Sequence, residues 1–534
     1  DWAMTQNNLG NAYVERILGE RAENIEKAIA ACTDALEVRT RSAFPVDWAM
    51  TQNNLGNAYV ERILGERAEN IEKAIAAYSA ALEVTTRSAF PVDWARTQNN
   101  LGNAYRDRIL GERAENIEFA LKACSAALEV RTRSAFPKDW ARTQNNLGNA
   151  YRDRILGERA ENIESAIAAC SAALEVLTRS AFPVDWAMTQ NNLGIAYRDR
   201  ILGEPAENIE SAIAAYSAAL EVRTRSAFPK DWAATQNNLG EAYRDRILKE
   251  RAENIELAIK ANTDALSVYT RSAFPENWAA TQNNLGNAYD SKILGERAEN
   301  IELAIKAYTD ILEVYTRTAF PQYWARTQNN LGNAYSDRIL GEPAENIELA
   351  IAAYTDALSV YTRSAFPENW AATQNNLGNA YAQRILGEPA ENIEKAIAAC
   401  TDALEVRTRS AFPVDWAMTQ NNLGIAYRNR IKGKRAENIE LAVKAYTDAL
   451  EVRTRSAFPQ DHAETLLNLG RLYQDEKQFN SAYNIFVKAI ETVEALRVEI
   501  ASGEEAKHKQ AEEWNQLYIR MVEVCLALAR DTEA

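Results

Sequence analysis

The segment DWAMTQNNLGNAYVERILGERAENIEKAIAACTDALEVRTRSAFPV occupies residues 1–46, and nine near-copies of it follow without a gap. Its tryptophan, Trp2, recurs as Trp48, as Trp94 and so on at an unbroken spacing of 46 residues up to Trp416. Strict self-similarity at a period of roughly 20–50 residues is the signature of a repeat architecture. One unit, whose positions we count from Asp1, therefore decides the fold of most of the chain.

Two segments of the unit, residues 2–18 and 25–40, carry apolar residues at helical spacing. In the first segment Trp2, Leu9 and Ile17 fall in one arc and polar residues fall opposite, which is the pattern of an amphipathic helix. In the second segment isoleucine and alanine recur three and four residues apart, again at helical spacing. The unit therefore predicts two helices, which we call the first and the second helix of each repeat.

Glycine, proline and aspartate mark the expected ends of these helices. Asp1 is placed to cap the first helix, and Gly19 follows it where a left-handed residue is favoured. Pro205, in repeat 5, is tolerated only outside a helix or in its first turn, so the second helix starts near it. Phe44-Pro45 is expected to end the second helix, because proline disfavours helical geometry in the residue before it.

A pair of antiparallel helices with one apolar face each cannot bury those faces alone, so each pair must stack on its neighbours. We therefore expect an all-α solenoid, with the recurrent tryptophans in contact between successive repeats. Cys32, Cys124, Cys170 and Cys400 share one position that other copies fill with tyrosine or asparagine. Buried, reduced thiols are expected there rather than a disulfide framework.

The segment after the tenth copy has a spacing similar to that of the tetratricopeptide repeat, carried by Leu469, Gly470, Tyr473, Ala482, Phe486 and Ala489. The 46-residue units resemble the same motif with longer helices and an enlarged loop, and Leu9, Gly10 and Tyr13 match its first helix. They depart from it in length, since the ordinary repeat has about 34 residues. The resemblance implies a right-handed superhelix of antiparallel helix pairs.

Three segments follow from these patterns. Residues 1–460 hold ten 46-residue repeats, residues 461–496 hold the unit of ordinary tetratricopeptide spacing, and residues 497–534 form a C-terminal region. Residues 504–530 of that region begin rich in charge and become amphipathic. A helix that caps the open apolar surface of the last repeat is expected there, and a separate binding element is the alternative.

Composition limits the classes of partner. The chain has 75 acidic and 60 basic residues and a formal net charge of −15, which argues against nucleic-acid or anionic-membrane partners that need a broad basic surface. No apolar run approaches the roughly 20 residues that a membrane span needs, and nothing at the start resembles a signal peptide. We therefore expect a soluble, cytoplasmic protein, with its oligomeric state left open.

Partners of tetratricopeptide proteins usually lie on the surface lined by the first helices, and each unit has an Asn-Asn pair there. The first asparagine of each pair forms a row made of Asn7, Asn53, Asn99, Asn145, Asn191, Asn237, Asn283, Asn329, Asn375 and Asn421. An asparagine side chain offers a donor and an acceptor, so such a row can pair with a peptide backbone of any sequence. The row resembles the asparagine ladders by which other tetratricopeptide proteins hold peptide backbones. Hydrogen bonds between repeats are the alternative use of one asparagine of each pair.

Variable positions on the same face gather arginine in repeats 3 to 6, namely Arg96, Arg106, Arg142, Arg152, Arg198 and Arg244. Arginine binds carboxylate or phosphate bidentately, so an acidic or phosphorylated segment of a partner is one prediction. The alternative is a solvated surface of mixed charge, because Asp107, Asp153, Asp199 and Asp245 adjoin these arginines.

Nothing in the sequence favours catalysis. The two histidines, His462 and His508, stand without an evident nucleophile and orienting partner. Isolated histidines and cysteines in a buried pattern lack the spacing of metal ligands, and no glycine-rich phosphate loop is present. The sequence therefore predicts a protein that is not an enzyme, with no catalytic residue, metal or cofactor.

The predicted function is a scaffold that holds a protein or an extended peptide in a concave groove. The alternative is the sensor or regulatory arm of a larger bacterial signalling or effector protein, because similar Trp-rich repeats are joined in that family to NTPase or caspase-like modules. The start at Asp1, on a repeat boundary and without an initiator methionine, suggests a fragment and slightly favours that alternative.

Overall fold

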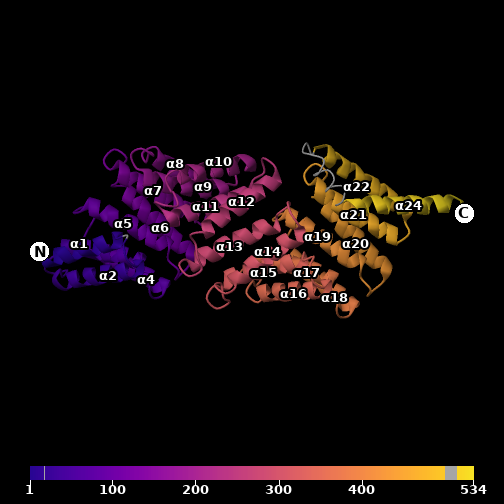
Figure 1. The fold of residues 1–534 in the computed structure, drawn as a ribbon, viewed down its shortest axis with the longest axis horizontal. Helices are drawn as coiled ribbons and strands as arrows, with labels where there is room; N and C mark the ends of the chain where they lie inside the picture. Colours follow the sequence, from indigo (N-terminus) through magenta and orange to yellow (C-terminus); the bar gives the residue numbers. More distant parts are fainter. Residues whose placement is uncertain (17, 500–513, 534) are drawn as a thin grey trace. The chain divides into compact units, whose positions relative to one another are not determined.

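The computed structural model describes residues 1–16, 18–499 and 514–533. Every regular element in these ranges is an α-helix, and the helices form pairs in chain order (Figure 1). The predicted all-α architecture of tandem helix pairs is confirmed. The chain divides into two compact units, residues 1–273 and residues 274–534.

The first unit holds one helix pair for each of repeats 1 to 6. Its first helices are α1 (Trp2–Glu15), α3 (Pro45–Val60), α5 (Pro91–Arg106), α7 (Pro137–Arg152), α9 (Pro183–Arg198) and α11 (Pro229–Asp245). Its second helices are α2 (Arg21–Val38), α4 (Arg67–Leu82), α6 (Arg113–Leu128), α8 (Arg159–Leu174), α10 (Pro205–Leu220) and α12 (Arg251–Leu266).

The second unit holds the pairs of repeats 7 to 11 and one further helix. Its first helices are α13 (Pro275–Asp290), α15 (Pro321–Ser336), α17 (Pro367–Gln383), α19 (Pro413–Arg428) and α21 (Pro459–Asp475). Its second helices are α14 (Arg297–Ile311), α16 (Pro343–Leu358), α18 (Pro389–Leu404), α20 (Arg435–Leu450) and α22 (Phe479–Glu499), and α24 (Asn515–Glu533) comes last.

Each first helix after α1 begins at a proline. In α3, Pro45 is the first helical residue, Phe44 precedes it with φ −138° and ψ 64°, and Asp47 lies inside the first turn. Proline suits the first turn because its missing N–H would have no helical acceptor there and its φ is already helical. The prediction that Phe44-Pro45 ends the second helix was wrong, since α2 ends at Val38 and the dipeptide starts the next helix. Pro205 begins α10, as predicted.

The first helices end earlier than predicted, and an exposed apolar loop follows them. Ile63 and Leu64 lie beyond the end of α3 with 59% and 50% of their surfaces exposed. The predicted buried arc was therefore wrong at this position, whose first copy, Ile17, lies outside the described residues. Gly19 has φ +84°, the left-handed geometry that the sequence predicted and that glycine adopts without steric cost.

The two helices of each pair cross closely at a glycine of the first helix. A Cβ on Gly10 would lie 2.6 Å from Sγ of Cys32, and a Cβ on Gly56 would lie 2.5 Å from Cε1 of Tyr78. Any larger residue would push the two helices apart at this crossing. Cys32 and its three counterparts are buried and free, which confirms the prediction of buried thiols. Burial raises the pKa of the Cys32 thiol to about 11.

Within each compact unit, the second helix of a repeat packs against the first helix of the next. In repeat 2, Ile71, Ile75 and Tyr78 of α4 form a buried cluster with Leu101 and Ala104 of α5. Equivalent clusters join α6 to α7, α8 to α9 and α10 to α11 in the first unit, and α16 to α17 in the second. Full burial of such a side chain contributes roughly 1.5–3 kcal/mol. Each repeat is therefore stabilised by its neighbours, as a solenoid requires.

The repeated tryptophans contact residues on both sides of their own helix pair, although they are only half-buried. Trp140 packs against Ala173 and Leu177 near the end of α8 and against Phe182, which precedes α9. Arg133 of the preceding repeat covers the ring, with its guanidinium carbon 5.5 Å from the ring centroid. Only the contact with Arg133 joins successive repeats, as predicted for tryptophan, because Ala173, Leu177 and Phe182 belong to the repeat of Trp140 itself.

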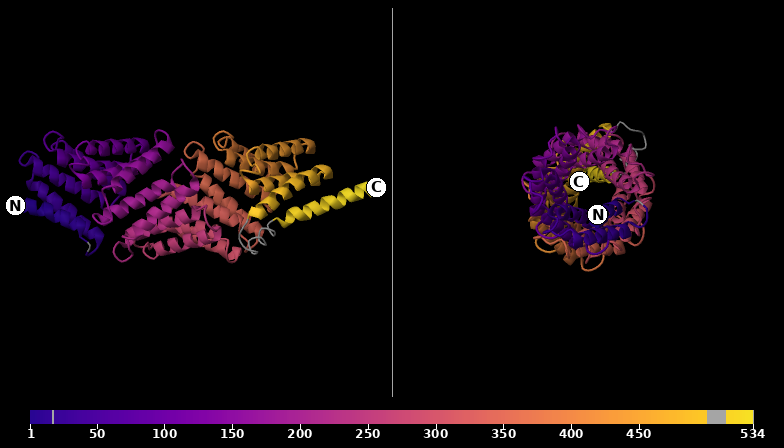
Figure 2. Two further views of the ribbon diagram at one scale, coloured as in Figure 1. Left: turned by 90° about the horizontal axis from the view of Figure 1, so that it is seen from above. Right: turned by 90° about the vertical axis from the view of Figure 1, so that its left-hand side faces the viewer.

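The second unit ends in α24, which packs on the last helix pair (Figure 2). Trp514, Leu517 and Val524 are buried there in one cluster with Phe486 and Ala489 of α22. The contact covers apolar surface that the last repeat would otherwise expose, which is the effect expected of a capping helix. Residues 504–513 of the predicted C-terminal region lie outside the described residues.

Candidate functional site

The first helices present a stripe of partly exposed residues in each repeat. In repeat 3 the stripe consists of Arg96, Asn100, Asn103 and Asp107, at positions 4, 8, 11 and 15 of the 46-residue repeat, whereas Asn99 is buried. Residues three and four apart lie on one side of a helix. We call the surface formed by these four positions and by position 14 in successive repeats the first-helix face.

The first asparagine of each predicted pair lies between repeats. Asn53 is 2% exposed, and its Oδ1 accepts a hydrogen bond of 3.2 Å from Nδ2 of Asn100 in the next repeat. The same bond recurs from Asn54 to Asn7, Asn146 to Asn99, Asn192 to Asn145, Asn238 to Asn191, Asn330 to Asn283, Asn422 to Asn375 and Asn468 to Asn421. In the predicted row Asn237 and Asn329 are partly exposed and the other members are buried.

These bonds confirm the alternative interpretation of the asparagine pairs, in which one asparagine of each pair links repeats. Adjacent residues of a helix point about 100° apart, so only one asparagine of a pair can face outward. The outward one is the second, at position 8, for example Asn100. Contact between the first row and a peptide backbone stays a prediction.

A third asparagine, at position 11, is oriented by a tyrosine that the sequence did not single out. Oη of Tyr78 donates to Oδ1 of Asn57 over 2.8 Å, and Nδ2 of Asn100 donates to the same oxygen over 3.1 Å. The amide nitrogen of Asn57 donates to none of the residues that the structure describes. The second unit repeats the arrangement at Asn287 with Tyr308 and Asn330, and at Asn333 with Tyr354 and Asn376. The signal was the joint occurrence of asparagine at position 11 and tyrosine at position 32.

A hollow of about 350 Å³ lies on the first-helix face of the first unit. It is lined by Val14, Arg21, Asn57, Val60, Glu61, Tyr78, Asn100 and Asn103. The lining combines amide groups with two apolar side chains and one ion pair, in which Arg21 and Glu61 approach to 3.2 Å. The lining is therefore mainly polar, whereas small-molecule sites are mostly apolar with a few placed polar groups.

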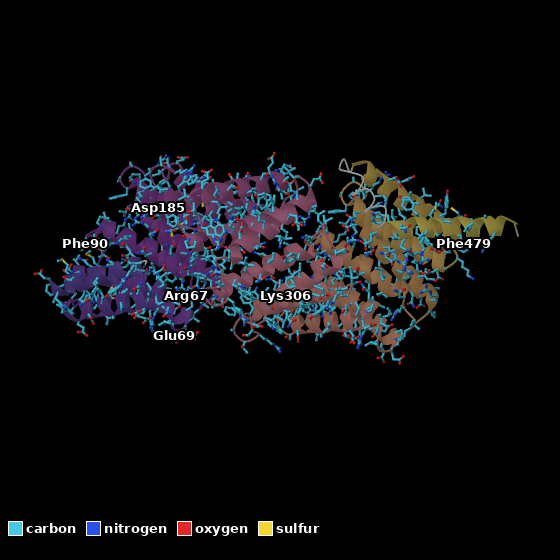
Figure 3. The ribbon with its side chains drawn as sticks, viewed as in Figure 1. Arg67, Glu69, Phe90, Asp185, Lys306 and Phe479 are labelled. Atoms are coloured by element: carbon cyan, nitrogen blue, oxygen red, sulfur yellow. The ribbon has the colours of Figure 1, made fainter. Side chains whose placement is uncertain are left out.

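Each of the six predicted arginines has an acidic partner inside the protein. The pairs are Arg96–Asp93, Arg106–Asp107, Arg142–Asp185, Arg152–Asp153, Arg198–Glu241 and Arg244–Asp245. Asp185 lies in the first turn of α9 (Figure 3) and receives two hydrogen bonds, of 2.9 and 2.8 Å, from Arg142. The surface is therefore one of mixed charge, which was the alternative to an anion-binding cluster.

The charge of the first-helix face changes along the chain. Position 14 holds arginine in repeats 3 to 6 but Asp290, Ser336 and Ala382 in repeats 7 to 9. Asp290 and Asp337 both face Arg297, at 3.5 and 3.4 Å. Burial raises the pKa of both carboxyl groups above the usual range, and the nearby Arg297 opposes that shift.

A smaller hollow of about 230 Å³ in the second unit is lined by residues that include Glu368, Arg407 and Asp415. Arg407 pairs with Asp415 at 3.3 Å and donates to Oγ1 of Thr419 over 3.1 Å. The guanidinium of Arg407 thus already has partners in the next repeat.

The described ranges contain neither a metal-binding cluster nor a membrane-spanning helix. No group of three or more His, Cys, Asp or Glu side chains there could hold a metal ion. None of the helices that the structure describes is long and apolar enough to cross a membrane.

Solved structures of helical repeat proteins are similar to this chain at low identity. The Cut9–Hcn1 hetero-tetramer of the APC/C matches at 14% identity and a TM-score of 0.41, over 96% of this chain and 86% of that chain. The apo form of RapI matches at 13% and 0.47, over 77% and 98%. A signal transduction ATPase with a tetratricopeptide repeat sensor from Pyrococcus horikoshii matches at 12% and 0.38, over 100% and 90%. No family profile and no curated protein matches the sequence.

The helix pairs themselves define the class. The two helices of each 46-residue repeat cross at a glycine. Within each compact unit, the second helix of a repeat packs on the first helix of the next, in the same way from repeat to repeat. The structure is therefore that of an all-α protein built from tandem helix-pair repeats.

Proposed function

We propose that the chain is a scaffold that binds a segment of another protein along its first-helix face, with the hollow over α1, α3 and α5 as an anchoring site. The observation that carries the proposal is the oriented amide of Asn57. Its oxygen accepts from Tyr78 and Asn100, so its N–H groups are left for a ligand. A peptide carbonyl oxygen is the natural acceptor for such a donor.

The rest of the hollow suits a peptide. Val14 and Val60 offer apolar contact to a side chain, and the Arg21–Glu61 pair offers both signs of charge at the edge. The oriented amide recurs at Asn287 and Asn333 in the second unit, so the same contact can be made more than once by an extended segment. Backbone recognition of this kind is tolerant of ligand sequence.

The partner need not be acidic. A ligand carboxylate or phosphate at the predicted arginines would have to displace the internal carboxylates that already pair with them. The proposal therefore places the main contact on the amides and treats arginines such as Arg106 as secondary. Catalysis forms no part of it, and a sensor role within a larger protein stays a prediction.

Site-specific photo-crosslinking tests the proposal. A benzophenone amino acid replaces Val60 at the hollow in one variant and Lys122, an exposed residue of α6, in the control. We expect host proteins to be captured from position 60 and not from position 122, and Asn57→Leu to abolish that capture. Equal capture from both positions, or capture that survives Asn57→Leu, would contradict binding at the hollow.

A further inference from the structure

Three buried polar atoms without a hydrogen-bond partner gather near the end of the second unit. They are Oη of Tyr446 in α20, and Nε of Arg471 and Oε1 of Gln474 in α21. The structure has eight such atoms among its described residues, so three on two adjacent helices is a concentration. An unpaired buried polar group is unfavourable, and Tyr446 is fully buried.

Arginines from three helices surround these atoms. Burial lowers the pKa of Arg471, and the charges of Arg428 in α19 and Arg520 in α24 lower it further. Arg428 pairs with Asp475 at 2.8 Å, and Arg520 pairs with Glu523 at 3.2 Å. Arg471 forms no ion pair with an acidic side chain among the described residues. The cluster of three arginines and two carboxylates therefore has a net charge of one positive unit.

The same local sequence in the first unit shows what is missing. Repeats 5 and 10 both read GIAYR in the first helix, at residues 194–198 and 424–428, and both have a buried tyrosine at position 32. In repeat 6 the residue corresponding to Arg471 is Glu241, which forms an ion pair with Arg198. The carboxylate at position 11 of repeat 6 is therefore replaced by the guanidinium of Arg471 in repeat 11, where Asp475 pairs with Arg428 instead.

We propose that Arg471, Tyr446 and Gln474, with Arg428 and Arg520 around them, form a binding site for a phosphate group, either free or carried on a side chain. The two unpaired donors, the N–H of Arg471 and the O–H of Tyr446, fit phosphate oxygens, and arginine is well suited to them. The unpaired acceptor, Oε1 of Gln474, fits the O–H of a singly protonated phosphate. A carboxylate or a sulfate has no such proton to donate near neutral pH.

The site also gives α24 a second role. Gln474 donates from Nε2 to Glu523 of α24 over 2.9 Å, and Arg520 belongs to the same helix. A bound phosphate between Arg471 and Arg520 would remove the repulsion between them and hold α24 more firmly on α21. Phosphate is therefore expected to slow amide hydrogen exchange in α24.

The test is titration of the whole chain with inorganic phosphate near pH 6, where inorganic phosphate keeps at least one proton, at constant ionic strength set with chloride. We expect binding by calorimetry and protection of α24 in hydrogen exchange. Arg471→Glu, which restores the charge found at Glu241, is expected to weaken binding at least tenfold, and Tyr446→Phe severalfold. Tyr216→Phe is the matched control and should change nothing.

Absence of binding at about 10 mM phosphate, or affinity unaltered by Arg471→Glu, would overturn the proposal. Arg471→Gln serves in place of Arg471→Glu if the latter lowers the melting temperature. Sulfate and acetate probe the acceptor, because equal affinity for them would remove the role of Gln474. A phosphoserine peptide and its serine form then separate the two sources: tighter binding of the phosphopeptide than of inorganic phosphate assigns the site to a phosphorylated partner, and the reverse order assigns it to free phosphate.

Discussion

Repeats 5–6 and repeats 10–11 share a local sequence and a buried tyrosine, yet they differ in charge. Tyr216 and Tyr446 both pack beside an isoleucine at position 11, Ile195 and Ile425, and neither hydroxyl has a partner. The residue at position 11 of the following repeat makes the difference in charge. Glu241 in repeat 6 forms an ion pair with Arg198, whereas Arg471 in repeat 11 adds a second positive charge beside Arg428. Near-identical repeats can therefore carry different sites without any change of fold.

The largest expected effect comes from filling the helix crossing in both places. A Cβ on Gly194 would lie 2.6 Å from Cε1 of Tyr216, and one on Gly424 would lie 2.6 Å from Cε1 of Tyr446. Gly194→Ala and Gly424→Ala should each destabilise the protein by about 1–3 kcal/mol, seen as a lower midpoint in chemical denaturation. Only Gly424→Ala should also weaken phosphate binding. Equal phosphate affinity in both variants would contradict a phosphate site confined to repeats 10 and 11.

The hydroxyl of the position-32 tyrosine should have opposite effects in different repeats. Tyr78→Phe removes the bond to Asn57 and should cost about 1 kcal/mol, whereas Tyr216→Phe removes an unpaired buried hydroxyl and should stabilise by a similar amount. Hydrogen exchange in α4 and α10 resolves the two changes locally. The same sign of change in both helices would show that Tyr216 has a partner.

Repeat 6 also differs from the other repeats at the left-handed residue that follows its first helix. Lys249 stands where nine other repeats have glycine, and its φ is +70°. A left-handed conformation is unfavourable for a residue with a Cβ, so Lys249→Gly should raise the free energy of unfolding by up to about 1 kcal/mol. Gly203→Lys, at the same position of repeat 5, should lower it. A fall in melting temperature for Lys249→Gly would mean that the lysine side chain makes a stabilising contact.

The smallest effect concerns pH. Arg246 donates to both carboxylate oxygens of Glu210 across the junction of repeats 5 and 6, and this hydrogen bonding lowers the pKa of Glu210 below 4.5. A lowered folded-state pKa gives stability that is present above the unfolded pKa and is lost as pH falls through the folded one. Glu210→Gln should therefore cost about 0.5 kcal/mol at pH 6 and nothing at pH 2.

The corresponding position at the junction of repeats 10 and 11 provides the control. Glu440 is exposed, and the residue facing it at position 16 of repeat 11 is Glu476, which pairs with Arg435 instead. Glu440→Gln should leave the melting temperature unchanged at both pH values. A similar fall in melting temperature for Glu210→Gln and Glu440→Gln would show that the ion pair of Glu210 with Arg246 does not cause the effect.

The repeat period, the two helices of each repeat and the buried cysteines could all be predicted from the sequence. These features depend on local spacing and on side-chain size, and ten copies make the pattern unmistakable. Helix ends were predicted less well from the sequence. Phe44-Pro45 is compatible with the end of one helix or the start of another, and the packing of the repeats selects the start. The sequence also overestimated burial at position 17, where Ile63 lies in a loop.

Which asparagines face outward could not be predicted from the sequence and depends on how the repeats pack. Asn99 and Asn100 are neighbours of one residue type, and the packing of the next repeat decides that the first is buried and the second is partly exposed. Orientation of Asn57 by Tyr78, and the unpaired state of Tyr446 and Arg471, depend on contacts between residues of different helices. Such contacts depend on distances that the chain acquires on folding, so local sequence spacing does not specify them.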